Sequence, residues 1–162
     1  MKHSTLFALV LSSMVLLSGT SSRAENLAEI LESGGLGTLI GTWVDQDTNG
    51  QALSLTYTWR IKDRVLGLSI KMPGDSSEAL IAVDPESGEV MHVSADESGG
   101  VGMGQWAEEN GVAMLTLKTV DSDEKKETVK VSHQIENDKL NMGLKNVTTG
   151  DEGEITLVRK SE

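Results

Sequence analysis

The segment QALSLTYTWRIKDRVLGLSIKM, residues 51–72, alternates apolar and polar residues on both sides of a Lys-Asp pair. Apolar residues at every second position are typical of a β-strand with one buried face. They are Leu53, Leu55, Tyr57, Trp59 and Ile61 before the pair, and Leu66, Leu68, Ile70 and Met72 after it. A turn at Lys62-Asp63 would join the two strands as an antiparallel hairpin. The fold is therefore expected to consist of strands with one dry face and one wet face.

The same alternation recurs between turn signals rich in Gly, Asp, Asn and Pro. Ten strands are predicted, at residues 39–45, 51–61, 64–72, 78–83, 89–95, 101–108, 112–120, 127–135, 140–147 and 154–160. Ten short strands joined by hairpin-length turns predict an all-β fold, because no helical pattern is long enough for parallel crossovers. An up-and-down antiparallel β-barrel of about ten strands is favoured, since closure removes edge strands. A two-sheet sandwich would show the same alternation and is the alternative.

Residues 1–24 have the layout of a secretory signal peptide. A basic start precedes an apolar run over residues 6–17, and Ser22 and Ala24 occupy the −3 and −1 positions of a cleavage site. The run is too short to span a bilayer. The chain contains no cysteine, hence no lipobox thiol and no disulfide, which favours a bacterial periplasmic or secreted location.

Two further segments complete the predicted organisation. Residues 25–38 should form a short helix and its lead-in, because Asn26 is a suitable N-cap, Glu29 completes a capping box and Gly34 can end the helix. Residues 39–162 then form one barrel domain, which suits the length of the mature chain.

The charge balance of the mature chain excludes two classes of partner. Without the leader, 12 basic residues stand against 25 acidic ones, a net charge of −13. A surface this acidic argues against nucleic acid and anionic membranes as partners. No membrane insertion is expected after signal cleavage, and the charge identifies no oligomeric state.

The turn DQDTNG, residues 45–50, resembles the first half of an EF-hand calcium loop. An EF-hand needs a bidentate Glu at its twelfth position, which here is Thr56 inside a predicted strand. Asn49-Gly50 is instead a strong hairpin signal. A solvated turn is predicted, with a weak calcium site as the alternative. His92 and His133 have no second ligand at metal spacing, so no metal and no cofactor is predicted.

Short motifs in a fixed order support a family resemblance. Gly41-Thr42-Trp43 resembles the G-x-W opening of lipocalins and the wider calycin group, and Arg159 resembles the basic residue that those barrels place over the tryptophan. The order GTW, Tyr57-x-Trp59, Asp84-Pro85-x-x-Gly88, then Gly102-x-Gly104-x-Trp106, is also similar to a family of exported bacterial barrel domains that has no assigned activity. The resemblance covers residues 39–160. It implies a single barrel closed by a Trp43–Arg159 cation–π pair beside the helix, and it implies no catalytic residue.

A ten-stranded barrel has room for a small apolar ligand besides its own side chains. We expect a non-catalytic site near Tyr57 and Trp59, lined also by Met72, Met103 and His133, because methionine adapts to varied shapes. The same methionines could equally be core filler. Two alternatives stay open: a structural or protein-interaction domain of the periplasm with a closed core, and a barrel enzyme that uses Tyr57 or His133. A solvent-filled cavity beside Tyr57 and Trp59 would favour binding or catalysis, and a packed interior would favour the structural domain.

Overall fold

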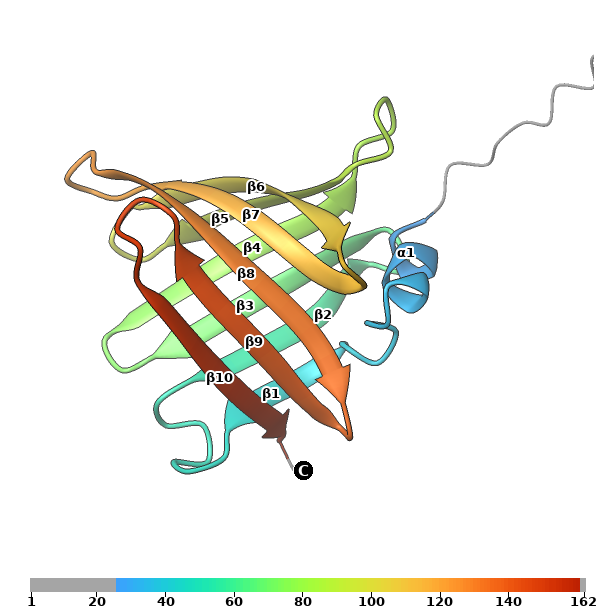
Figure 1. The fold of residues 1–162 in the computed structure, drawn as a ribbon, viewed down its shortest axis with the longest axis horizontal. Coiled ribbons are helices and arrows are strands. Elements are labelled where there is room, and N and C mark those ends of the chain that lie inside the picture. The colour runs from blue at the N-terminus through green and yellow to red at the C-terminus, as the bar shows by residue number, and fades with distance from the viewer. Residues whose placement is uncertain (1–25, 161–162) are drawn as a thin grey trace, which may run out of the picture.

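A computed structural model of the chain describes residues 26–160 (Figure 1). In this range one helix precedes ten β-strands, which close into a barrel. The elements are α1 (Leu27–Ser33), β1 (Gly41–Asp45), β2 (Ser54–Ile61), β3 (Val65–Met72), β4 (Asp75–Val83), β5 (Val90–Asp96), β6 (Val101–Glu109), β7 (Val112–Val120), β8 (Lys126–Glu136), β9 (Lys139–Asn146) and β10 (Glu152–Arg159). The predicted signal peptide, residues 1–24, lies outside the described residues.

The strand order is an up-and-down meander. Each strand pairs antiparallel with its neighbours in the chain, and β1 pairs with β10 to close the ring. The closing register places Trp43 opposite Arg159 and Asp45 opposite Leu157. The predicted all-β barrel with a short N-terminal helix is confirmed, and the sandwich alternative is wrong because the ladder of paired strands is continuous.

The strand boundaries differ from the prediction mainly at two turns. β4 begins at Asp75, because Asp75 and Ser76 already pair with Met72 and Lys71 of β3. The predicted five-residue turn is thereby reduced to Pro73 and Gly74. The DQDTNG connection is longer than predicted, since β2 begins only at Ser54.

The two ends of the barrel carry different connections. At the end beside α1, the hairpins at Asn110-Gly111 and Asn137-Asp138 have positive φ at both central residues, between 51° and 80°. This is the geometry of type I′ turns, which match the twist of paired strands. The tight turns leave this mouth of the barrel to be covered by α1.

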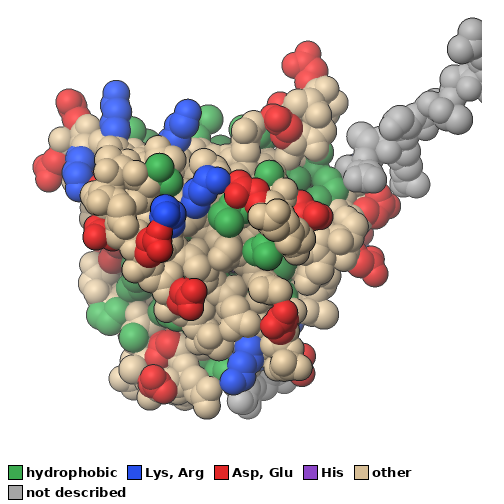
Figure 2. All heavy atoms as spheres, in the orientation of Figure 1, with side chains coloured by type: hydrophobic (Ala, Val, Ile, Leu, Met, Phe, Trp, Pro, Cys, Tyr) green, Lys and Arg blue, Asp and Glu red, His purple; other side chains and the backbone are tan. Residues whose placement is uncertain are grey.

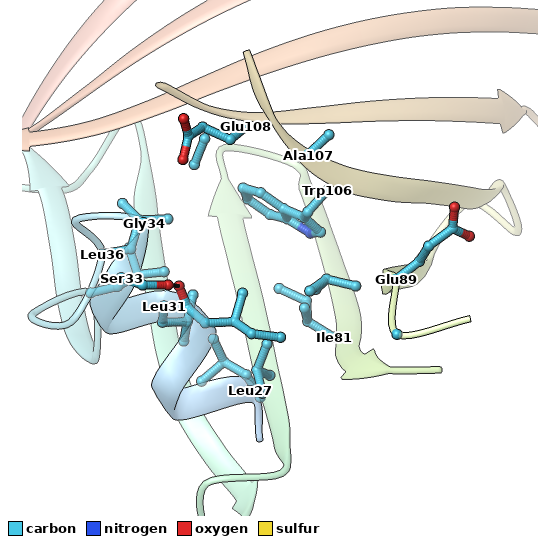
Figure 3. A pocket seen from close by; sticks show the side chains of 16 residues that line it. Leu27, Leu31, Ser33, Gly34, Leu36, Ile81, Glu89, Trp106, Ala107 and Glu108 are labelled. Carbon is cyan, nitrogen blue, oxygen red and sulfur yellow. Dashed lines mark hydrogen bonds between the residues drawn. The ribbon is translucent and has the colours of Figure 1, made fainter. Parts of the chain in front are cut away.

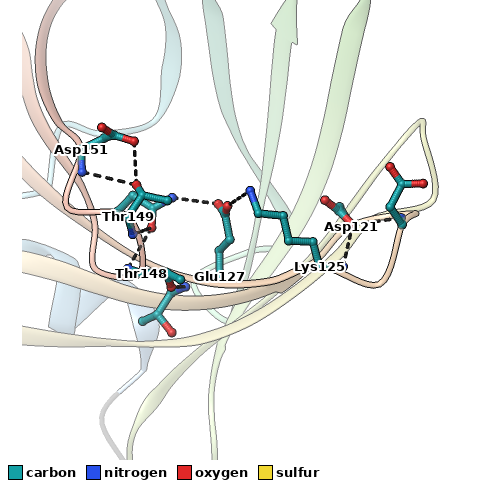
Figure 4. Close-up of polar contacts among 9 residues, drawn as sticks. Asp121, Lys125, Glu127, Thr148, Thr149 and Asp151 are labelled. Atoms are coloured by element: carbon teal, nitrogen blue, oxygen red, sulfur yellow. Dashed lines mark hydrogen bonds and ion pairs between the residues drawn. The ribbon is translucent and has the colours of Figure 1, made fainter.

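At the opposite end, the β7–β8 and β9–β10 loops are held by polar contacts (Figure 4). The carboxylate of Glu127 accepts a hydrogen bond from the Asn146 amide at 2.8 Å and forms an ion pair with Lys125. One oxygen of Asp121 accepts from the backbone N–H groups of Asp123 and Lys125, each at 2.9 Å. These loops satisfy their own polar groups, so this end is a polar rim.

α1 lies over the mouth that carries the Asn110-Gly111 and Asn137-Asp138 turns (Figure 1). The burial of its apolar side chains holds it there. Asn26 and Glu29 form the predicted capping box, with bonds of 3.0 and 3.2 Å. Seven residues are too few for a helix that is stable alone. Leu27 is fully buried against the core, and the Ala28 N–H donates to the Asp63 carbonyl in the β2–β3 turn at 3.4 Å.

Candidate functional site

Trp43 and Arg159 hold in place the lead-in segment that connects α1 to β1. The Arg159 guanidinium carbon lies 4.3 Å from the centroid of the Trp43 ring, which is the cation–π arrangement that the resemblance to lipocalins implies. Arg159 also donates to the carbonyl oxygens of Ile40, at 2.9 Å, and of Thr38. The Trp43 Nε1 donates to the Leu39 carbonyl at 2.8 Å. These bonds hold the lead-in against the barrel wall and so determine where α1 lies.

Tyr57 and His133 form a polar contact across the barrel interior. Both side chains are buried, and the Tyr57 hydroxyl lies 3.3 Å from His133 Nε2. His133 Nδ1 lies 3.4 Å from the Val131 carbonyl oxygen. Because a carbonyl only accepts, Nδ1 carries the ring proton, and Nε2 accepts from the tyrosine hydroxyl. The contact joins β2 to β8 and fills the interior at this level.

The electrostatics of this pair follow from its burial. Burial lowers the pKa of His133 to about 4, against a partial opposing effect of the Val131 carbonyl, and the neighbouring His92 lowers it further. Burial also raises the pKa of the Tyr57 phenol well above its ordinary value. Both groups are therefore neutral at physiological pH, as a group removed from water favours its uncharged form.

The structure adds Trp106 and His92 to this pair. The Trp106 ring lies 4.6 Å from the His133 ring and 6.3 Å from the His92 ring, centroid to centroid. His92 is buried, and burial lowers its pKa to about 4. Neither His92 Nδ1 nor Trp106 Nε1 makes a hydrogen bond with a described residue, although both atoms are buried. His92 and Trp106 thus add two unpaired polar atoms to an interior whose other buried polar side chains, Tyr57 and His133, contact each other.

An apolar cavity of about 320 Å³ lies between α1 and the inner wall of the barrel (Figure 3). Leu27, Ile30 and Leu31 of the helix form one side. Trp106, on β6, lies opposite the helix, with Ile81 of β4 beside it. The remaining lining includes Leu36, Leu39, Leu66, Val90 and Ala113, and its charged members are Glu89 and Glu108. The lining is that of a site for an apolar molecule with a few polar groups at its rim.

The predicted site residues separate into two groups. Tyr57 and His133 meet in the interior, and Trp59 is half-buried against the same core. Met72 faces inward but stands at the last position of β3, at the polar rim, where it is 45% exposed. Met103 is 60% exposed on the outer wall, so its assignment to the ligand lining is wrong.

The cavity also lies elsewhere than expected. Neither Tyr57 nor Trp59 lines it; its aromatic residue is Trp106. The sequence did contain a signal for Trp106, namely the Gly-x-Gly-x-Trp spacing, which places Gly102, Gly104 and Trp106 on one face of β6. That face could not be recognised as inward from its hydrophobicity, since two of its residues are glycines.

Residues 46–50 form a turn, as predicted for DQDTNG. The loop itself occupies both carboxylate oxygens of Asp45. One accepts from the Leu53 N–H at 2.8 Å, and the other accepts from the N–H and hydroxyl of Thr48. Among residues 26–160, no group of three or more His, Cys, Asp or Glu is arranged to hold a metal ion. In the same range, no helix has the length and apolar character needed to cross a membrane.

No family model and no curated protein matches the chain. The fold itself, a closed ten-stranded antiparallel barrel, is compatible with a lipocalin-like architecture.

Proposed function

We propose that this is an exported envelope protein whose barrel binds a small, mostly apolar molecule without converting it. The observation that carries the proposal is the cavity beside α1, whose volume of about 320 Å³ is at the lower end of the range for ligand pockets. Its walls are aliphatic, apart from the Trp106 ring and the polar rim. Burying an apolar molecule there stabilises the complex by about 25 cal/mol per Å² of surface removed from water.

The unpaired Trp106 Nε1 supports a ligand that carries a hydrogen-bond acceptor. A buried donor without a partner costs about 1–3 kcal/mol, and a ligand oxygen that reached this atom would offset that cost. Trp106 lines the cavity and also lies against His133. A ligand beside Trp106 would therefore be oriented by the interior polar groups without displacing the Tyr57–His133 contact.

The contact between Tyr57 and His133 also bears on the two alternative functions, a barrel enzyme and a structural or interaction domain. Tyr57 and His133 are buried and bonded to each other, so the geometry gives little support to either as a catalytic acid or base. A filled interior at this level does favour the second candidate function, a structural or interaction domain of the periplasm. We also place the chain, as a proposal, among lipocalin-like domains, supported by the Trp43–Arg159 geometry.

The ligand proposal is tested by native mass spectrometry of protein purified from its own host, followed by titration calorimetry with decanol. We expect a bound small molecule, or one decanol per chain. Ala113→Phe, which fills the cavity from β7, should abolish binding. Ala95→Phe, the same change at an exposed position of β5, should leave binding intact. An empty protein that binds neither decanol nor a panel of lipids, quinones and porphyrins would favour the structural domain.

The proposed export is tested separately, by N-terminal sequencing of the protein from the periplasm and medium. Cleavage after Ala24 should give a chain that begins Glu25-Asn26-Leu27. A different first residue, or retention in the membrane fraction, would contradict this part of the proposal.

A further inference from the structure

We infer that the cavity beside α1 selects its ligand by charge, accepting apolar molecules with an ammonium group and rejecting those with a carboxylate. This inference rests on the proposed function, because it presumes that the cavity is the binding site. It identifies the ligand as a cationic amphiphile whose tail lies between α1 and Trp106 and whose head group lies at the rim.

Glu108 is the first observation behind this inference. It follows Trp106 by two positions on β6, so its side chain projects from the same inward face. Its partner in the ladder is Ala113, and both residues line the cavity. Glu108 forms no ion pair with any described residue, whereas Glu109, of opposite phase, is paired with Lys130 at 2.9 Å. Of these two adjacent carboxylates, the inward one at the mouth, Glu108, is therefore the one without a cationic partner among the described residues.

The remaining charge at the mouth has the same sign. Glu89 is the second acid of the lining, and one of its oxygens accepts from the Gln105 amide at 2.6 Å. Glu89 and Glu108 lie on different sides of Trp106 (Figure 3). Among the described residues that line the cavity, none is Lys or Arg. In Figure 2, acidic side chains lie at the edge that carries α1, and most of the visible basic side chains lie away from it.

The Trp106 ring would contribute to the same preference. The face of an indole attracts a cation within about 6 Å of its centroid by about 0.5–2 kcal/mol, depending on desolvation. An anionic head group would meet the Glu108 carboxylate, with the Glu89 carboxylate beside Gln105 at the outer edge of the mouth, and would find no opposing cation in the described lining. Since like charges at close range disfavour binding and opposite charges favour it, the lining discriminates between head groups on otherwise identical tails.

The test is titration calorimetry of the mature protein with decylamine, decanol and decanoate, all below their micellar concentrations. We expect decylamine to bind most tightly and decanoate most weakly. Glu108→Gln should weaken decylamine binding about three- to tenfold and leave decanol binding unchanged. The matched control is Glu109→Gln, which removes the adjacent, outward carboxylate and should change the affinity for decylamine by less.

A second variant reverses the charge of the site. Leu31→Lys, at a half-buried helix position in the lining, should weaken decylamine binding and strengthen decanoate binding. The charge inference is overturned if decanoate binds the native protein as tightly as decylamine, if Glu108→Gln and Glu109→Gln have equal effects, or if decylamine binding survives Ala113→Phe. Failure of all three probes to bind would instead overturn the proposed function itself.

Discussion

At residue 41, the backbone requires glycine. Gly41 has a φ of 126°, and a Cβ there would lie 2.8 Å from Nη1 of Arg159. A side chain would strain the backbone and push the guanidinium away from the Trp43 ring. The glycine and tryptophan of the G-x-W pattern therefore belong to one contact, in which the glycine makes room for the cation that covers the indole.

We predict that Arg159→Ala lowers the free energy of unfolding by about 1–3 kcal/mol, because it removes a cation–π contact and two hydrogen bonds to carbonyl groups. Urea denaturation followed by tryptophan fluorescence measures the change. The control is Arg60→Ala, since Arg60 is exposed and its ion pair with Glu78, at 3.4 Å, lies on the surface, where such pairs contribute little. Equal losses in the two variants would contradict the closure role of Arg159.

Among the elements, β6 decides the shape of the site. A Cβ at Gly104 would lie 2.4 Å from the Thr116 carbonyl oxygen, and one at Gly102 would lie 2.5 Å from the Ser94 hydroxyl. The inward face of β6 therefore lies too close to its neighbours for side chains at these two positions. Trp106 is the next inward residue toward the mouth, so the first bulky side chain of this row reaches the cavity beside α1.

The connection between β1 and β2 is an element stabilised by its own side chains. We predict that Asp45→Ala lowers the melting temperature by a few degrees, because it removes the acceptor for Thr48 and Leu53. The Thr48 hydrogen bond holds the pKa of Asp45 below its ordinary value, so the contribution is present at neutral pH and is lost as the pH falls. Differential scanning calorimetry measures the shift.

The control for this element is Asp47→Ala, which should have a smaller effect. Millimolar calcium should leave the melting temperature of the native protein unchanged, because the loop already occupies both Asp45 oxygens. A rise of several degrees with calcium, abolished by Asp45→Ala, would show the DQDTNG turn to be a metal site, since binding to the folded state alone stabilises it.

For the whole molecule, the buried histidines link stability to pH. Folding lowers the pKa of His92 and His133 from 6.5 to about 4. Between these values the unfolded chain binds more protons than the barrel does, so the free energy of unfolding falls as the pH is lowered. By about pH 5 the loss should be on the order of 2 kcal/mol per histidine.

Urea denaturation at pH 7, 6 and 5 tests this prediction. In this range most carboxylates are ionised in both the folded and the unfolded chain, so they contribute least to the pH dependence of stability. His92→Gln and His133→Gln should each reduce the dependence of the unfolding free energy on pH, whatever their effect on stability at pH 7. No other histidine follows residue 24, so the double variant should be nearly flat. If the unfolding free energy depended on pH with the same slope in the native protein and in all three variants, the assignment of this dependence to His92 and His133 would be contradicted.

The sequence determined the ten strands, most of their inward faces and the capped helix, and the contact of Trp43 with Arg159 was expected from the resemblance to lipocalins. Alternation, turn chemistry and capping act over a few residues, and the first and last strands of a closed meander must pair. It did not determine the phase of β6, because an inward row that contains two glycines has no hydrophobic alternation; Met103 was misplaced for this reason.

Only the tertiary structure decided where the barrel is full and where it has room. Tyr57 and His133 are 76 positions apart, and whether they touch depends on the tilt and register of strands that are not neighbours. The contact fills the interior at that level. The free space lies instead between α1 and Trp106, a boundary set by how a short helix, unstable alone, lies over the mouth. Local sequence cannot specify such a space, because it is the volume left after every side chain has been placed.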